Sequence, residues 1–224
     1  MNHCRLAAAV AAIGLALASG APRAADDVGH FQVTITNLTQ GQQFTPLLLV
    51  SHRSSVHLFM LGAAASSQLR TLAEEGNTGP LATLLRATPG VREVVTGTDL
   101  TNPGATKSFT IAAGEDEQLS LAAMLIPTND GFVAVDALNL SFAPREVTVF
   151  APAYDSGTER NDELCSSIPG PFFLECGGAG GGAQVVGGEG FVHIHAGIHG
   201  VGDLKPALRD WRNPVAKIVI RRVE

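Results

Sequence analysis

The chain has few cysteines, and none of them belongs to the motif of a thiol metal site. Of the three, Cys4 lies near the start, and Cys165 and Cys176 lie close together in the second half. Their spacing is not Cys-x-x-Cys, and no third thiol follows them in the sequence. An even pair in an oxidising compartment predicts a Cys165–Cys176 disulfide that closes a small loop.

The motifs of common hydrolases and of EF-hands are also absent. The sequence contains no Gly-x-Ser-x-Gly and no His-Glu-x-x-His, and no pattern singles out a Ser, His and Asp triad. We therefore predict that the chain catalyses no reaction. Because the EF-hand loop pattern is not matched, a calcium site would have to be assembled from separate loops.

Only one long apolar run occurs, and it lies at the start. Residues 1–5 are short and basic, residues 6–18 are apolar apart from Gly14, and small residues follow at 19–21. This layout is typical of a secretory signal peptide, here residues 1–25, cleaved between about residues 21 and 25. The run is shorter than the ~20 residues that span a bilayer. We expect residues 26–224 to form one secreted domain, periplasmic or extracellular, without a transmembrane segment.

Basic residues are in the minority. Removing Arg5 and Arg23 with the signal leaves 13 of the 15 Lys and Arg residues against 21 Asp and Glu residues, a net charge near −8. An acidic surface argues against nucleic acid as a partner and is compatible with cation binding.

Hydrophobic periodicity predicts an antiparallel β-sandwich. Residues 31–37 alternate apolar and polar side chains, as a half-buried strand does. Short strands separated by Gly, Pro and Asn turns favour an all-β sandwich over repeated βαβ units, with one or two short helices in the connections. The predicted strands are 31–37, 47–50, 107–111, 117–126, 132–138, 146–150, 190–195 and 215–221, and the predicted helices are 66–75 and 81–87. The glycine-rich stretch 177–190 is predicted to be a surface loop.

Two acidic loops could bind a hard cation. Asp130 lies in the turn Thr-Asn-Asp-Gly at 128–131, and four further acids crowd residues 155–163. Loops at one end of a sandwich converge, and calcium takes six to eight oxygen ligands. The alternative is that these acids are only solvated, because Asn-Asp-Gly is ordinary turn chemistry.

The same two loops resemble the spondin domain, a module of extracellular matrix proteins and of stand-alone bacterial proteins. "PTNDGFVAVD" at 127–136 is similar to the family pattern Pro-Ser-Pro-Asp-Trp-Phe-Val-Gly-Val-Asp, and "YDSGTE" at 154–159 is similar to an aromatic residue followed by Asp-Ala-Gly-Thr-Asp. The departures are Asn129 for Pro, Gly131 for Trp, Ala134 for Gly and Glu159 for the last Asp. The likeness runs from about residue 31 to the C-terminus and includes "WRNPVAKI" at 211–218.

The resemblance implies a C2-like sandwich that binds one calcium ion at its edge loops. By position, the ligands would be Asp130, Asp155 and Glu159, with Asp136 and Asp162 in supporting roles. Asp136 falls on the strand after the loop, so it would order the turn and not touch the ion. The implied function is recognition of, or adhesion to, an extracellular or cell-envelope protein or glycan.

A histidine cluster offers a different hypothesis. In "HIHAGIHG", His193 and His195 share strand parity, and His199 follows past Gly197. Three imidazoles would suit zinc or copper, and the chain would then be a periplasmic metal-binding protein or a metal-dependent enzyme. The alternative is a set of structural or surface histidines.

Overall fold

The computed structural model describes residues 28–114, 116–140, 146–170, 174–177, 180–182 and 187–223. The predicted signal peptide with its cleavage site, and part of the glycine-rich stretch 177–190, lie outside the described residues. Within them, no helix is long and apolar enough to cross a membrane.

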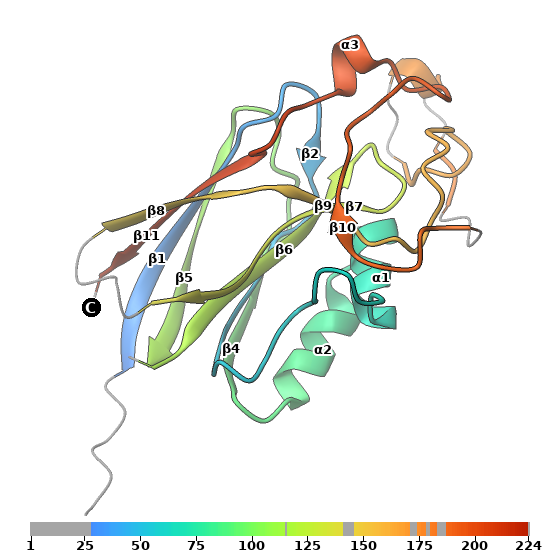
Figure 1. Ribbon diagram of the computed structural model, residues 1–224. Helices are drawn as coiled ribbons and strands as arrows, with labels where there is room; N and C mark the ends of the chain where they lie inside the picture. The colour runs from blue at the N-terminus through green and yellow to red at the C-terminus, as the bar shows by residue number, and fades with distance from the viewer. Residues whose placement is uncertain are drawn as a thin grey trace, which may run out of the picture.

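Two antiparallel sheets form the molecule, as the sequence predicted (Figure 1). One sheet has the order β5 (Thr106–Gly114), β1 (Val28–Asn37), β11 (Ala216–Arg222) and β8 (Glu146–Ala151). The other has the order β10 (His193–Ile194), β9 (Ala153–Asp155), β7 (Gly131–Asn139), β6 (Gln118–Ile126), β3 (Leu48–His52) and β4 (Val91–Thr96), and β2 (Gln43–Phe44) pairs with β6.

The main core lies between the sheets. Strand β1 follows the predicted alternation: Phe31, Val33 and Ile35 are buried, and the residues between them are half-exposed. Strand β6 is buried on both faces, because Leu121 faces the other sheet while Ala122 belongs to a second apolar cluster. A strand covered on both sides reads as a continuous apolar run, which explains the sequence LAAMLI at 121–126.

Two helices bury the outer face of the larger sheet. Helix α1 (Ser67–Glu75) begins after Ser66, whose Oγ accepts a hydrogen bond from the Leu69 N–H, and it ends at Gly76 with φ 67°. Helix α2 (Gly79–Ala87) has a proline in its first turn, where no amide hydrogen is needed. Their buried leucines belong to the second apolar cluster. Figure 1 shows both helices beside the larger sheet, so this part of the molecule has three layers.

The predicted helices and strands are confirmed, except that the strand predicted at 190–195 is reduced to the two residues of β10, and several short elements were missed. The missed elements are β2, β4, β9, the one-turn 3-10 helix η1 (Leu174–Cys176) and helix α3 (Pro206–Arg209). The most consequential omission is β9. Pro152 separates it from β8, and β8 and β9 belong to different sheets, so the chain crosses the sandwich at this proline.

The edge β7–β9–β10 determines where the acidic loops lie. Gly131 at the start of β7 pairs with Asp155 at the end of β9, and His193 of β10 pairs with the same Asp155. Asp130, Asp155 and His193 therefore meet at one end of the larger sheet although they come from distant parts of the sequence.

Candidate functional site

Asp130 is the most enclosed acid of this edge. Its side chain is 0% exposed. One oxygen, Oδ2, accepts hydrogen bonds from the Ser156 hydroxyl (2.8 Å) and from the backbone N–H groups of Thr158 (2.8 Å) and Glu159 (3.1 Å). The turn 128–131 thus holds the loop 156–159 through a single carboxylate oxygen. The other oxygen, Oδ1, is buried and accepts no hydrogen bond from the residues that the structure describes.

Asp155 and Glu159 are buried beside it, each 1% exposed. Asp155 accepts hydrogen bonds from the Gly157 N–H (2.7 Å, to Oδ1) and from Asn161 Nδ2 (2.7 Å, to Oδ2). The backbone N–H of Glu159 faces the Asp130 carboxylate. The structure therefore places Asp130 and Asp155 close enough to interact electrostatically, on the loops that flank β7 and β9, and joins Glu159 to them through its backbone N–H.

The electrostatics of the cluster disfavour negative charge without a cation. Burial, followed by the charge of Asp155, raises the pKa of Asp130 to about 6, although hydrogen bonds from Ser156, Thr158 and Glu159 act in the opposite direction. Burial also raises the pKa of Asp155. Among the described residues, no lysine or arginine forms an ion pair with Asp130 or Asp155. The cluster is therefore suited to a cation or to an added proton.

Asn129 and Asp162 fix the two loops from the other side. Asn129 donates from Nδ2 to Asp162 Oδ1 (3.0 Å), and its Oδ1 accepts from the Glu163 N–H (3.1 Å). Asp162 also accepts from the Leu164 N–H (2.9 Å) and from the Ser167 hydroxyl (2.8 Å). Asp162 thus joins the turn 128–131 to residues 164–167, and its supporting role at a calcium site stays a prediction.

Glu163 has a role that sequence reasoning missed. Its buried carboxylate accepts three backbone hydrogen bonds, from His199 (2.6 Å), Gly200 (2.7 Å) and Val201 (3.0 Å). It thereby ties the segment 199–201 to the acidic loop. The acidic composition of 155–163 did not distinguish a residue that holds a loop from one that faces a cation.

Asp136 supports a different segment from the one expected. Its carboxylate accepts hydrogen bonds from the Leu58 N–H (2.7 Å) and from Ser120 Oγ (3.2 Å), and it pairs with His57 Nδ1 (2.7 Å). The prediction that Asp136 orders the turn at 128–131 is therefore corrected: it anchors the segment 57–58 against β7. The neighbouring His52–Ser120 hydrogen bond (2.7 Å) joins two residues that are 0% exposed.

The three histidines of the alternative hypothesis do not gather around one point. His195 is buried against Trp211 (ring centroids 4.9 Å apart), and its Nδ1 accepts the Gly197 N–H (3.0 Å). His199 is exposed. Among the described His, Cys, Asp and Glu side chains, the group whose ligand atoms all lie within 4.8 Å of one another is Asp155, Glu189 and His193. Asp130, Asp155 and Glu159 do not form such a group, so their carboxylates are spaced more widely.

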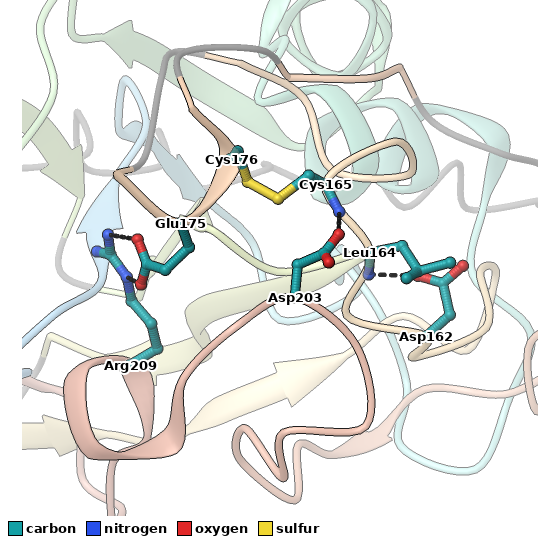
Figure 2. The surroundings of a disulfide bond; sticks show 7 residues. All are labelled: Asp162, Leu164, Cys165, Glu175, Cys176, Asp203 and Arg209. Carbon is teal, nitrogen blue, oxygen red and sulfur yellow. Dashed lines mark hydrogen bonds and ion pairs between the residues drawn. A yellow bond between two sulfur atoms is a disulfide. The ribbon is translucent and has the colours of Figure 1, made fainter.

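The predicted disulfide is confirmed. Cys165 and Cys176 are bonded, with Cα atoms 5.5 Å apart. Figure 2 shows that the loop is held at both ends: Asp203 Oδ2 accepts the Cys165 N–H (2.9 Å), and Arg209 donates two hydrogen bonds to Glu175 (2.8 and 2.9 Å). The disulfide-bonded loop therefore begins two residues after the acidic loop 155–163.

Comparison with known families supports the resemblance that the two acidic loops indicated. Residues 34–165 match the family described as Spondin_N, the spondin N-terminal domain. The match includes both acidic loops and covers more than half of the chain, whereas the stretch 211–218 lies beyond it. No curated protein matches the chain.

Proposed function

The chain belongs to the spondin N-terminal domain family, and we propose that it is a secreted recognition module whose edge loops bind one calcium ion through Asp130, Asp155 and Glu159. The family is one of extracellular, non-enzymatic modules. The observation that carries the calcium proposal is the buried Asp130 Oδ1, which lacks a hydrogen-bond donor among the described residues. A buried carboxylate oxygen without a donor or a cation is costly.

The donor set fits a hard cation. Three carboxylates supply only oxygen, and the remaining positions of a calcium site are commonly filled by backbone carbonyls and water. Bound calcium would supply the positive charge that the cluster lacks. Because the three carboxylates are spaced more widely than the Asp155 group, calcium would draw the loops 128–131 and 155–159 together.

The chain's own residues prepare this site before any ion arrives. The Ser156 hydroxyl and the Thr158 and Glu159 amides hold Asp130 through Oδ2 and leave Oδ1 to face the ion. Gly157 and Asn161 orient Asp155 by donating one hydrogen bond to each of its two carboxylate oxygens. The bound ion would fix the shape of the loop edge, and that edge would contact an extracellular or cell-envelope protein or glycan.

The test is thermal unfolding of the secreted form with its disulfide intact, after chelation and with calcium added back. Calcium that binds only the folded state raises the melting temperature by mass action. In Asp130→Asn the calcium response should disappear, while the chelated protein should unfold at the wild-type temperature or above it, because the substitution removes a repelled charge.

Asp99→Asn is the matched control, because Asp99 is an exposed acid on another loop, 73% exposed at its side chain. It should respond to calcium like the wild type. A wild-type melting temperature that is indifferent to calcium, or an equal response in Asp130→Asn, would contradict the proposal.

A further inference from the structure

We propose that Asp155, Glu189 and His193 form a second metal site, with mixed nitrogen and oxygen ligands, that binds zinc or a similar divalent transition-metal ion. These are the residues whose ligand atoms lie within 4.8 Å of one another in the part of the chain that the structure describes. The site differs from the three-histidine site that the sequence suggested, because it keeps His193 alone and adds two carboxylates. It shares Asp155 with the proposed calcium site and differs from that site in its other two ligands, Glu189 and the imidazole of His193.

The distances within the group fit ligands that share an ion better than partners in a hydrogen bond. His193 Nε2 lies 3.6 Å from Asp155 Oδ1 and 3.5 Å from Glu189 Oε2. Hydrogen bonds between nitrogen and oxygen extend to about 3.2 Å. Two ligands of a tetrahedral ion with bonds of about 2.0–2.1 Å are about 3.3–3.4 Å apart. A small contraction of the present arrangement would produce that geometry.

The imidazole of His193 is held in the tautomer that a metal requires. Its Nδ1 lies 3.0 Å from the Ile194 carbonyl oxygen, which can only accept, so Nδ1 carries a proton and, in the neutral ring, the lone pair is on Nε2. The Nε2 atom is buried and has no hydrogen-bond partner among the described residues. An Nδ1–H bonded to a backbone carbonyl is the usual outer-shell support of a metal-binding histidine.

His195 provides the internal contrast. Its Nδ1 accepts the Gly197 N–H, so in the neutral ring the proton is on Nε2 and no lone pair is available there. The two histidines share strand parity in the sequence, yet their hydrogen bonds give them opposite tautomers. Only His193 is prepared as a ligand through Nε2.

The strands hold two of the three ligands firmly, and the third is accessible. Asp155 and His193 are direct partners in the β9–β10 pair, so their spacing is set by the sheet. Hydrogen bonds from Asn161 and Gly157 orient the Asp155 carboxylate. The Glu189 side chain is 41% exposed and that of His193 is 27% exposed, so an ion can enter from solvent and a water molecule can complete its coordination.

The test is zinc binding by isothermal titration calorimetry to the secreted form, with cobalt absorption as a second readout of coordination. His193→Asn should lower the zinc affinity by about 100-fold or more, and Glu189→Gln by about 10-fold. Both variants should keep the calcium-dependent rise in melting temperature, because neither residue belongs to the calcium ligands. That retained response also shows that the variants fold, and it separates failure of this site from failure of the calcium site.

His199→Asn is the matched control, because it removes a nearby exposed imidazole outside the group. Its zinc affinity should stay within about twofold of the wild type. The proposal is overturned if zinc does not bind the wild type, if His193→Asn binds zinc as tightly as the wild type, or if His199→Asn weakens binding as much as His193→Asn does.

Discussion

Gly131 of β7 and Asp155 of β9 are direct partners across an antiparallel strand pair. This pairing places the turn that carries Asp130 beside the loop that begins at Ser156, where the Ser156 N–H also bonds the Asp130 carbonyl (3.2 Å). The register of two strands, and not the path of a free loop, therefore decides the distance between the buried acids. A site built on paired strands is more rigid than one built on loops alone.

Gly131 should not tolerate a side chain. A Cβ at this position would lie 2.8 Å from Thr128 Oγ1 and 2.9 Å from His195 Cδ2. We expect Gly131→Ala to lower the free energy of unfolding by about 1–3 kcal/mol, because both neighbours are buried and must move. Urea unfolding measures this. Gly182→Ala is the control, since a Cβ there meets no atom of the described residues within 4 Å. Equal effects of the two substitutions would show that crowding at Gly131 is not the cause.

The same contact explains a departure from the family pattern. Where that pattern has tryptophan, this chain has Gly131, and the space that a side chain would enter contains His195, which packs on Trp211. The motif at 127–136 shows that tryptophan is replaced by Gly131. It does not show that His195 and Trp211 lie beside this glycine, because both residues come from a distant part of the sequence.

Strands with a strong apolar pattern and the two acidic loops could be predicted from the sequence. Short strands, and strands with a weak apolar pattern, could not. Strands with one or both faces buried, such as β1 and β6, carry a clear apolar pattern. Strand β4 lies at a sheet edge with no residue fully buried, so its pattern is weak. Strand β9 has three residues, and Glu189 lies in a glycine-rich stretch without periodicity. The group that orients His193 is the backbone carbonyl of Ile194. Every residue type has this group, so no residue pattern in the sequence indicates it.

Asp136 should contribute to stability and not to metal binding. Asp136→Ala removes the acceptor of the Leu58 N–H and the partner of His57, and we expect a loss of about 1–3 kcal/mol in the free energy of unfolding. The calcium-dependent rise in melting temperature should keep its wild-type size, because Asp136 makes no hydrogen bond to the acidic loops in the described structure. If Asp136→Ala still folds but loses the calcium response, Asp136 contributes to calcium binding and the prediction is wrong.

The disulfide should stabilise the fold by restricting the unfolded chain. Cys165 and Cys176 are separated by 11 positions, and closing a loop of that length is worth about 3 kcal/mol in the chain-entropy model. The Cys165→Ser, Cys176→Ser double variant should lose about this amount in urea unfolding and should no longer respond to reductant. The Arg209–Glu175 pair still holds the loop in the variant, so the folded structure should persist. An unchanged unfolding midpoint would contradict the chain-entropy account of this disulfide.

Stability should fall in acid partly because of Glu175. The hydrogen bonds from Arg209 lower the pKa of Glu175 below its ordinary value of 4.5, although burial acts in the opposite direction. A carboxyl whose folded pKa is depressed stabilises the protein fully above its unfolded pKa and loses that contribution as the pH falls through the folded pKa. Wild type should therefore be more stable than Glu175→Gln above about pH 5, and the difference should shrink steadily below about pH 4. Urea unfolding across this range measures it, with Glu146→Gln, an exposed acid on β8, as the control. If the difference between wild type and Glu175→Gln were the same at every pH, the charge of Glu175 would not be the source of its contribution.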